Sequence, residues 1–228
     1  MNSIKKMMLP GALGCLISRM AYADGSSPQP VKPYWQDIQV VAVNKEKPRS
    51  SFMSYADRET ALTSRFEKSP YYSLLNGTWK FFFVDSYKDL PQNITDPSVN
   101  TSSWDDITVP GNWEVQGHGV AIYTNHGYEF KPRNPQPPLL PEANPVGVYR
   151  RDIEIPASWD NRDIYLHIGG AKSGLYVYLN GKEVGYSEDS KNPAEFLINK
   201  YLQPGKNVLT LKIFRWSTGS YLECQDFW

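Results

Sequence analysis

One carboxylate, that of Asp189, lies where the sequence predicts a polar loop on a β-scaffold. The strand predicted at residues 175–179 alternates apolar and aromatic positions, and Asn180-Gly181 then supplies the two positive-φ residues of a tight hairpin turn. The chain returns and opens into the polar run GYSEDSKNPAEF at residues 185–196, which carries Asp189. A carboxylate accepts hydrogen bonds from hydroxyl groups, and charge-assisted hydrogen bonds are the stronger kind. The pattern therefore indicates a site for a hydroxyl-rich ligand.

Other arrangements that carry chemistry do not occur in the sequence. There is no Gly-x-Ser-x-Gly motif, which a serine nucleophile elbow would need, and no phosphate-binding loop. The histidines His118, His126 and His167 lack metal-ligand spacing, and His167 is interpreted as a packed or half-exposed side chain on a strand. The neighbouring carboxylates of Asp105 and Asp106 are interpreted as a solvated turn and not as a catalytic pair.

Several short strands separated by turns are expected to position the Asp189 loop. Strands are predicted at residues 78–84, 149–155 and 164–168 and at residues 209–213, which follow a turn. Short strands without a long helical period indicate an antiparallel sandwich. In the last two strands alternate apolar residues share one face: Ile164, Leu166 and Ile168 in one, and Leu209, Leu211 and Ile213 in the other.

Two segments depart from the strand pattern. Residues 35–72 mix polar and aromatic residues with weak periodicity, which predicts an irregular N-terminal arm that wraps over the domain surface. Residues 131–145 hold six prolines, which predicts an extended, irregular, Pro-rich loop.

The composition limits the class of protein. A chain of 228 residues has room for one large all-β domain or two small ones. Lys plus Arg and Asp plus Glu each number 24, so no basic excess indicates a nucleic-acid partner. The 15 Tyr and 7 Trp residues suit a β-sandwich core and also suit sugar binding, and core packing is the simpler explanation for any single one of them.

The first 23 residues have the pattern of a cleavable signal peptide. Lys5 and Lys6 form a basic start, residues 7–17 are mainly apolar, and a small-x-small cleavage site ends at Ala23. Cys15 offers lipid attachment as the alternative. We therefore expect an exported protein, periplasmic or secreted, and favour cleavage after Ala23 over a lipoprotein.

After the signal peptide we predict a linker at residues 24–34 and one domain at residues 35–228. The linker is rich in Ser, Pro and Gln. No later stretch approaches the roughly 20 apolar residues that a membrane span needs. If cleavage follows Ala23, Cys224 is the only cysteine left, and no intrachain disulfide forms.

An ordered set of motifs carries a family resemblance. The set closely resembles the N-terminal sugar-binding domain of bacterial β-galactosidases of glycoside hydrolase family 2. The resemblance runs from about Trp35 to Trp228. Its main segments are VPGNWE at 109–114, IYTN at 122–125, the run at 185–196 and RWSTGSYLECQDFW at 215–228, and LLNGTW at 74–79 and NPVGVYR at 144–150 fit the same pattern.

The resemblance implies a galactose-binding-domain-like jelly-roll β-sandwich that precedes an immunoglobulin-like domain and a catalytic (β/α)8 barrel. Family members retain configuration and use two glutamates on the barrel, which retaining chemistry places about 5 Å apart. Because the chain ends at Trp228, we expect a fragment that carries substrate-binding residues, no catalytic residue and no activity of its own.

The resemblance assigns roles to two residues. Asp189 matches the aspartate that reaches into the galactose pocket and that, in some members, touches a monovalent cation. Asn125 matches an asparagine at the pocket rim, whose amide both donates and accepts hydrogen bonds. From the residues alone, a turn-stabilising role for Asp189 and a loop cap at Asn125 stay open. The sequence departs from the family at Cys224, where an acidic residue is common, and at residues 126–129.

The leading hypothesis is the N-terminal region of a β-galactosidase, with a galactoside and the missing barrel as partners and a homo-oligomer as the full-length form. The alternative is a free-standing carbohydrate-binding module or lectin, and a third hypothesis is a domain that mainly supports oligomer contacts. We expect no cofactor in this chain; the resemblance allows Mg²⁺ and Na⁺ in the full-length enzyme. We interpret Trp104, Trp113 and Trp216 as core or interdomain residues.

Overall fold

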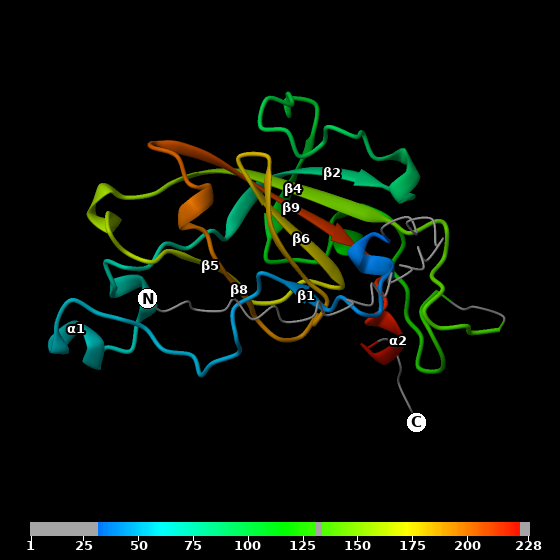
Figure 1. Ribbon diagram of the computed structural model, residues 1–228, viewed down its shortest axis with the longest axis horizontal. Helices are drawn as coiled ribbons and strands as arrows, with labels where there is room; N and C mark the ends of the chain where they lie inside the picture. The colour runs from blue at the N-terminus through cyan, green and yellow to red at the C-terminus, as the bar shows by residue number, and fades with distance from the viewer. Residues whose placement is uncertain (1–31, 131–133, 224–228) are drawn as a thin grey trace, which may run out of the picture. The chain divides into compact units, whose positions relative to one another are not determined.

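Antiparallel strands dominate the computed structural model, which describes residues 32–130 and 134–223 (Figure 1). Within these residues one seven-stranded sheet has the order β1-β7-β6-β9-β4-β2-β3, and β5 pairs with β8 in a second sheet. The strands of the large sheet are β1 (Ala42–Val43), β2 (Gly77–Val84), β3 (Asp105–Val109), β4 (Val146–Glu154), β6 (Gly174–Leu179), β7 (Lys182–Ser187) and β9 (Lys206–Phe214). Those of the second are β5 (Tyr165–Ile168) and β8 (Ala194–Leu197).

The helices are short. The α-helices are α1 (Arg58–Leu62) and α2 (Ser220–Glu223). In the part of the chain that the structure describes, no helix has the length and apolar character that crossing a membrane requires. The 3₁₀ turns are η1 (Tyr34–Gln36), η2 (Phe66–Lys68), η3 (Tyr87–Asp89), η4 (Trp113–Gln116), η5 (Ala157–Trp159) and η6 (Asn199–Tyr201).

The large sheet has an apolar cluster on each of its two faces. Successive side chains of a strand point to opposite faces, so one strand supplies residues to both clusters. In β6, Leu175 and Val177 enter one hydrophobic cluster, whereas Tyr176 and Tyr178 enter the cluster on the opposite face. The predicted hairpin follows β6: Asn180 has φ 53° and Gly181 has φ 77°, as a tight turn of this kind requires.

The second sheet covers the first of these clusters. Leu166 of β5 and Phe196 of β8 are 5% and 0% exposed and pack into the cluster with Leu175 and Val177. All members of the two predicted apolar faces, at residues 164–168 and 209–213, also lie in this cluster or pack against it. The predicted all-β jelly-roll sandwich is therefore confirmed, with layers of unequal size.

The start of the N-terminal arm covers the other face of the sheet. Trp35 is 2% exposed, and its ring stacks on Phe214 with the centroids 4.8 Å apart. The segment was predicted to wrap over the domain surface, and Trp35 departs from this because the large sheet has a second apolar face for the indole to enter. Farther along the arm, β1 pairs with the edge strand β7.

Two further predictions need correction. Asp105 and Asp106 begin strand β3 and do not form a turn, although both are exposed, and Asp106 pairs with Lys80 at 2.8 Å. The polar run at residues 185–196 is only partly a loop, because β7 continues to Ser187 and β8 begins at Ala194. Pairing with neighbouring strands and burial of alternate side chains extend both strands into the polar run.

The Pro-rich loop is irregular over its described part, residues 134–145, which contain no helix or strand. The predicted signal peptide at residues 1–23, most of the predicted linker, residues 131–133 and Cys224 lie outside the described residues.

Candidate functional site

The site lies at one end of the large sheet, where β9 ends and β4 and β6 begin. Strand register brings these ends together, because Phe214 pairs with Val146 on one side and with Gly174 on the other. The segment at residues 215–223 follows β9 here and ends in α2, which Figure 1 shows just beyond the β9 arrow. The loop at residues 188–193 follows β7 at the same end of the sheet.

Asp189 is presented to solvent on this loop. Its side chain is 49% exposed. The amide nitrogen of Asn192 donates to both carboxylate oxygens, at 3.0 and 3.1 Å, and the Lys45 ammonium lies 4.0 Å from Oδ2. The contact with Asn192 is the turn-stabilising interaction that the sequence left open. It leaves about half of the side-chain surface free to meet a ligand.

Asn125 is exposed on a bend in a second loop, the Asn125 loop, whose described part after η4 is residues 117–130. The preceding Thr124 closes this bend, since its hydroxyl donates to the carbonyl oxygen of His126 at 2.8 Å. Among the residues that the structure describes, no hydrogen bond joins Asn125 to Asp189. The structure connects the two loops through the segment at residues 215–223 instead.

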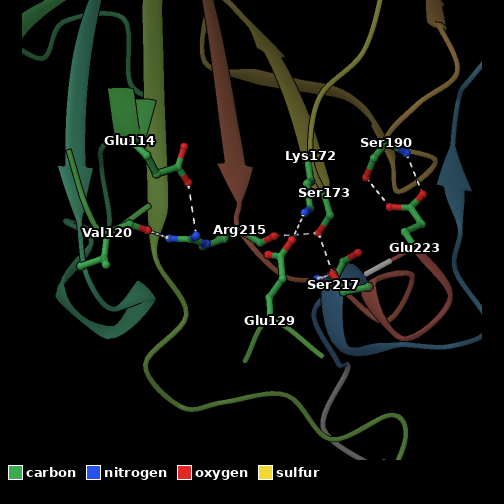
Figure 2. Close-up of polar contacts among 10 residues, drawn as sticks. Glu114, Val120, Glu129, Lys172, Ser173, Ser190, Arg215, Ser217 and Glu223 are labelled. Carbon is green, nitrogen blue, oxygen red and sulfur yellow. Dashed lines mark hydrogen bonds and ion pairs between the residues drawn. The ribbon is translucent and has the colours of Figure 1, made fainter. Parts of the chain in front are cut away.

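The Asn125 loop contacts this segment through Arg215 and Tyr221. The guanidinium of Arg215 donates to the carbonyl oxygen of Val120 at 2.9 Å and lies 3.5 Å from the Glu114 carboxylate (Figure 2). The rings of Tyr128 and Tyr221 meet edge to face with centroids 4.9 Å apart. These contacts bracket Asn125 in sequence.

A second set of contacts ties the residues just before β6 to both neighbours. Lys172 forms an ion pair with Glu129 on the Asn125 side, and Ser173 contacts the segment at residues 215–223. The hydroxyl of Ser173 lies 3.2 Å from that of Ser220, which accepts a hydrogen bond from the backbone nitrogen of Ser217 at 3.1 Å (Figure 2). All three serines are fully buried, so the segment is anchored where it crosses the end of the sheet.

Glu188 holds the segment from the Asp189 side. Its carboxylate is buried and accepts hydrogen bonds from the Tyr186 hydroxyl at 2.7 Å, the Thr218 hydroxyl at 2.9 and 3.0 Å, and the Gly219 backbone nitrogen at 2.8 Å. Burial raises the pKa of Glu188, and these hydrogen bonds oppose the rise. Glu188 was not predicted as a functional residue, because nothing in the run SEDS separates a buried carboxylate from an exposed one.

The remaining polar and aromatic candidates have structural roles. Trp104, Trp113 and Trp216 are 7%, 5% and 7% exposed, so of the two predicted roles, core or interdomain, burial within this domain bears out the core role. His167 is half exposed, as predicted, and its ring nitrogen lies 2.9 Å from the Glu195 carboxylate.

The residues around Asp189 do not by themselves fit a bound cation. Its polar neighbours are the amide nitrogen of Asn192 and the ammonium of Lys45, which are hydrogen-bond donors and not ligands. Over residues 32–130 and 134–223, no three His, Cys, Asp or Glu side chains form a group that could hold a metal ion. The hard cations Na⁺ and Mg²⁺ prefer several oxygen ligands, so further oxygens would have to come from elsewhere.

Comparisons with known proteins identify relatives of the chain. It is 38% identical over 199 residues to a β-galactosidase of Priestia megaterium, a match that covers 86% of this chain and 19% of the relative. It is 37% identical over 194 residues to a β-galactosidase of Psychromonas ingrahamii, covering 85% of this chain and 18% of the relative. The chain thus spans less than a fifth of the length of these relatives.

Among solved structures, a Bifidobacterium dentium β-glucuronidase matches with a TM-score of 0.45 and 21% sequence identity, over 61% of this chain and 19% of that one. A family model, described as the sugar binding domain of glycosyl hydrolases family 2, matches residues 72–228. This match covers β2 to α2 and includes both predicted site residues, Asn125 and Asp189. The chain therefore belongs to glycosyl hydrolase family 2, of which it carries the sugar binding domain.

Proposed function

We propose that the chain is the N-terminal region of a retaining β-galactosidase and contributes sugar-binding residues to an active site whose catalytic glutamates lie outside it. The observation that carries the proposal is the half-exposed carboxylate of Asp189, held on a short loop at the end of the sandwich. The name β-galactosidase that the relatives share supports galactosides as the substrate class.

The chemistry assigned to these residues is binding and orientation. The Asp189 carboxylate accepts hydrogen bonds from sugar hydroxyls, and the Asn125 amide both donates and accepts at the rim. Retaining hydrolysis itself needs an acid/base and a nucleophile about 5 Å apart, a role that this proposal leaves to a barrel outside the chain. A cation at Asp189 would take its other ligands from the same source.

The purified chain is expected to hydrolyse no β-galactoside, because the proposal places both catalytic carboxylates elsewhere. Residues 24–228 would be assayed with a chromogenic β-galactoside and a chromogenic β-glucuronide, beside the protein encoded by the complete reading frame. The longer protein should turn over the galactoside faster than the glucuronide.

Turnover by the chain alone, after removal of contaminating host enzyme, would contradict this division of roles.

Calorimetric titration of residues 24–228 with galactose tests the lectin alternative. A free-standing binding module should bind in this titration, whereas the proposal expects no measurable binding, since only Asn125 and Asp189 contact the sugar from this chain.

For localisation we propose export with removal of the first 23 residues, on the basis of the basic start, the apolar run and the site ending at Ala23. Intact-mass analysis of material exported by a bacterial host should place Asp24 first. A retained Met1 or a lipid adduct at Cys15 would contradict this.

For the full-length form we propose a homo-oligomer. Light scattering would measure its molar mass in solution.

A further inference from the structure

Asp189 lies between two residues that are both held in place. On one side, the backbone nitrogen of Glu188 donates to the Val41 carbonyl oxygen at 3.1 Å. Glu188 as a whole residue is 3% exposed. On the other side, Ser190 is 7% exposed, and its backbone nitrogen donates to Glu223 Oε1 at 2.8 Å. The backbone of Asp189 is therefore fixed at both ends, while its side chain stays half exposed.

The contacts on the two sides run in opposite directions. Glu188 reaches from the loop to Thr218 and to the backbone nitrogen of Gly219. Glu223 reaches back from α2 to the backbone nitrogen and the hydroxyl of Ser190 (Figure 2). Each segment thus supplies one carboxylate to the other, and we call this pair, Glu188 and Glu223, the carboxylate clasp.

From these contacts we propose that Glu188 and Glu223 are positioning residues that set the orientation of the Asp189 carboxylate for the sugar. The inference rests on the proposed function, since it assumes that Asp189 binds the substrate. Misplacing a binding group by about 1 Å can cost up to about 100-fold in rate, so a fixed backbone at Asp189 is of direct use.

The clasp also orients the two predicted site loops relative to each other. Its partners Thr218 and Gly219 belong to the segment whose Arg215 and Tyr221 contact the Asn125 loop. Breaking the clasp therefore removes these hydrogen bonds between the Asp189 loop and the segment that contacts the Asn125 loop.

A double-mutant cycle separates positioning from simple stabilisation. In the protein encoded by the complete reading frame, Glu223→Gln keeps the shape of the side chain but replaces one acceptor with a donor that faces Ser190. We expect kcat/KM for a chromogenic β-galactoside to fall about fivefold when Asp189 is present and to change by less than about 1.5-fold in the Asp189→Ala background. Glu188→Gln is expected to behave in the same way.

Glu195→Gln is the matched control. Glu195 lies in β8, just after the loop at residues 188–193. Its carboxylate pairs with Arg49 at 2.8 Å and with His167 at 2.9 Å, and neither partner belongs to the segment at residues 215–223. Its substitution is expected to leave kcat/KM within about twofold of the parent.

Each outcome supports or overturns a distinct statement. If Asp189→Ala alone leaves kcat/KM unchanged, the proposed function fails. If Asp189→Ala lowers kcat/KM but the clasp variants do not, or lower it by the same factor in both backgrounds, the positioning role is overturned. If either glutamine variant fails to fold, Ser190→Ala, which removes the hydroxyl that donates to Glu223 and to the Glu188 carbonyl oxygen, takes its place in the cycle and faces the same criterion.

Discussion

Replacing Asp189 with alanine in the full-length protein is expected to lower kcat/KM for a β-galactoside at least tenfold. A hydrogen bond to a charged group contributes about 1.5–3 kcal/mol, and each 1.4 kcal/mol is about a factor of ten. The midpoint of thermal unfolding should move by no more than about 2 °C, because a half-exposed loop side chain contributes little to burial. Steady-state kinetics and thermal unfolding of the same preparation measure both quantities.

Two further variants serve as controls for Asp189→Ala. Asn125→Ala should lower kcat/KM in the same direction but less, since a neutral hydrogen bond contributes about 0.5–1.5 kcal/mol. Asn192→Ala removes the amide that donates to Asp189 but leaves the carboxylate, and it should have a smaller effect than Asp189→Ala. If Asp189→Ala left kcat/KM unchanged, or if its loss only tracked unfolding, Asp189 would be a turn-stabilising residue and the sugar-site assignment would be abandoned.

Phe196→Ala is expected to cause the largest loss of stability. Phe196 is fully buried between the two sheets, and truncating a buried Phe costs about 3–5 kcal/mol in the free energy of unfolding. For a domain of this size the midpoint of thermal unfolding should fall by about 6–20 °C. Differential scanning calorimetry of residues 24–228 measures the change.

The adjacent Leu197 provides the matched control for Phe196. It lies in the same strand, β8, but its side chain is 38% exposed, so Leu197→Ala should change the free energy of unfolding by only about 0.5 kcal/mol. Equal losses from both substitutions would show that β8 does not present alternate faces to the core and to solvent.

Much of the fold was predictable because strand formation leaves a local pattern. Side chains alternate across a strand, so the apolar residues at 164–168 and 209–213 identified core faces before their partners were known. The hairpin at Asn180-Gly181 was equally local, since both residues adopt the positive φ that the turn requires. Ordered motifs then indicated the family, and the family model confirmed it.

Burial within polar stretches was not predictable in this way. Glu188 and Asp189 are consecutive acidic residues, yet the first is 3% exposed and the second presents a side chain that is 49% exposed. The difference comes from Thr218 and Gly219, which lie about thirty residues further along the chain and supply the hydrogen bonds to Glu188. A carboxylate is buried only where such donors meet it, and no local pattern records them.

The sequence alone thus indicated most of the longer strands, the hairpin and the family, but not β1, β3 or β8, and the family's motifs nominated Asn125 and Asp189 as candidate sugar contacts. Each of these depends on side-chain period, turn chemistry or a motif within a few residues. Only the tertiary structure decided which polar residues hold the site together. The register of β9 against β4 and β6 delivers residues 215–223 to the end of the sheet, and that long-range placement makes Glu188 and Glu223 the partners of the two loops.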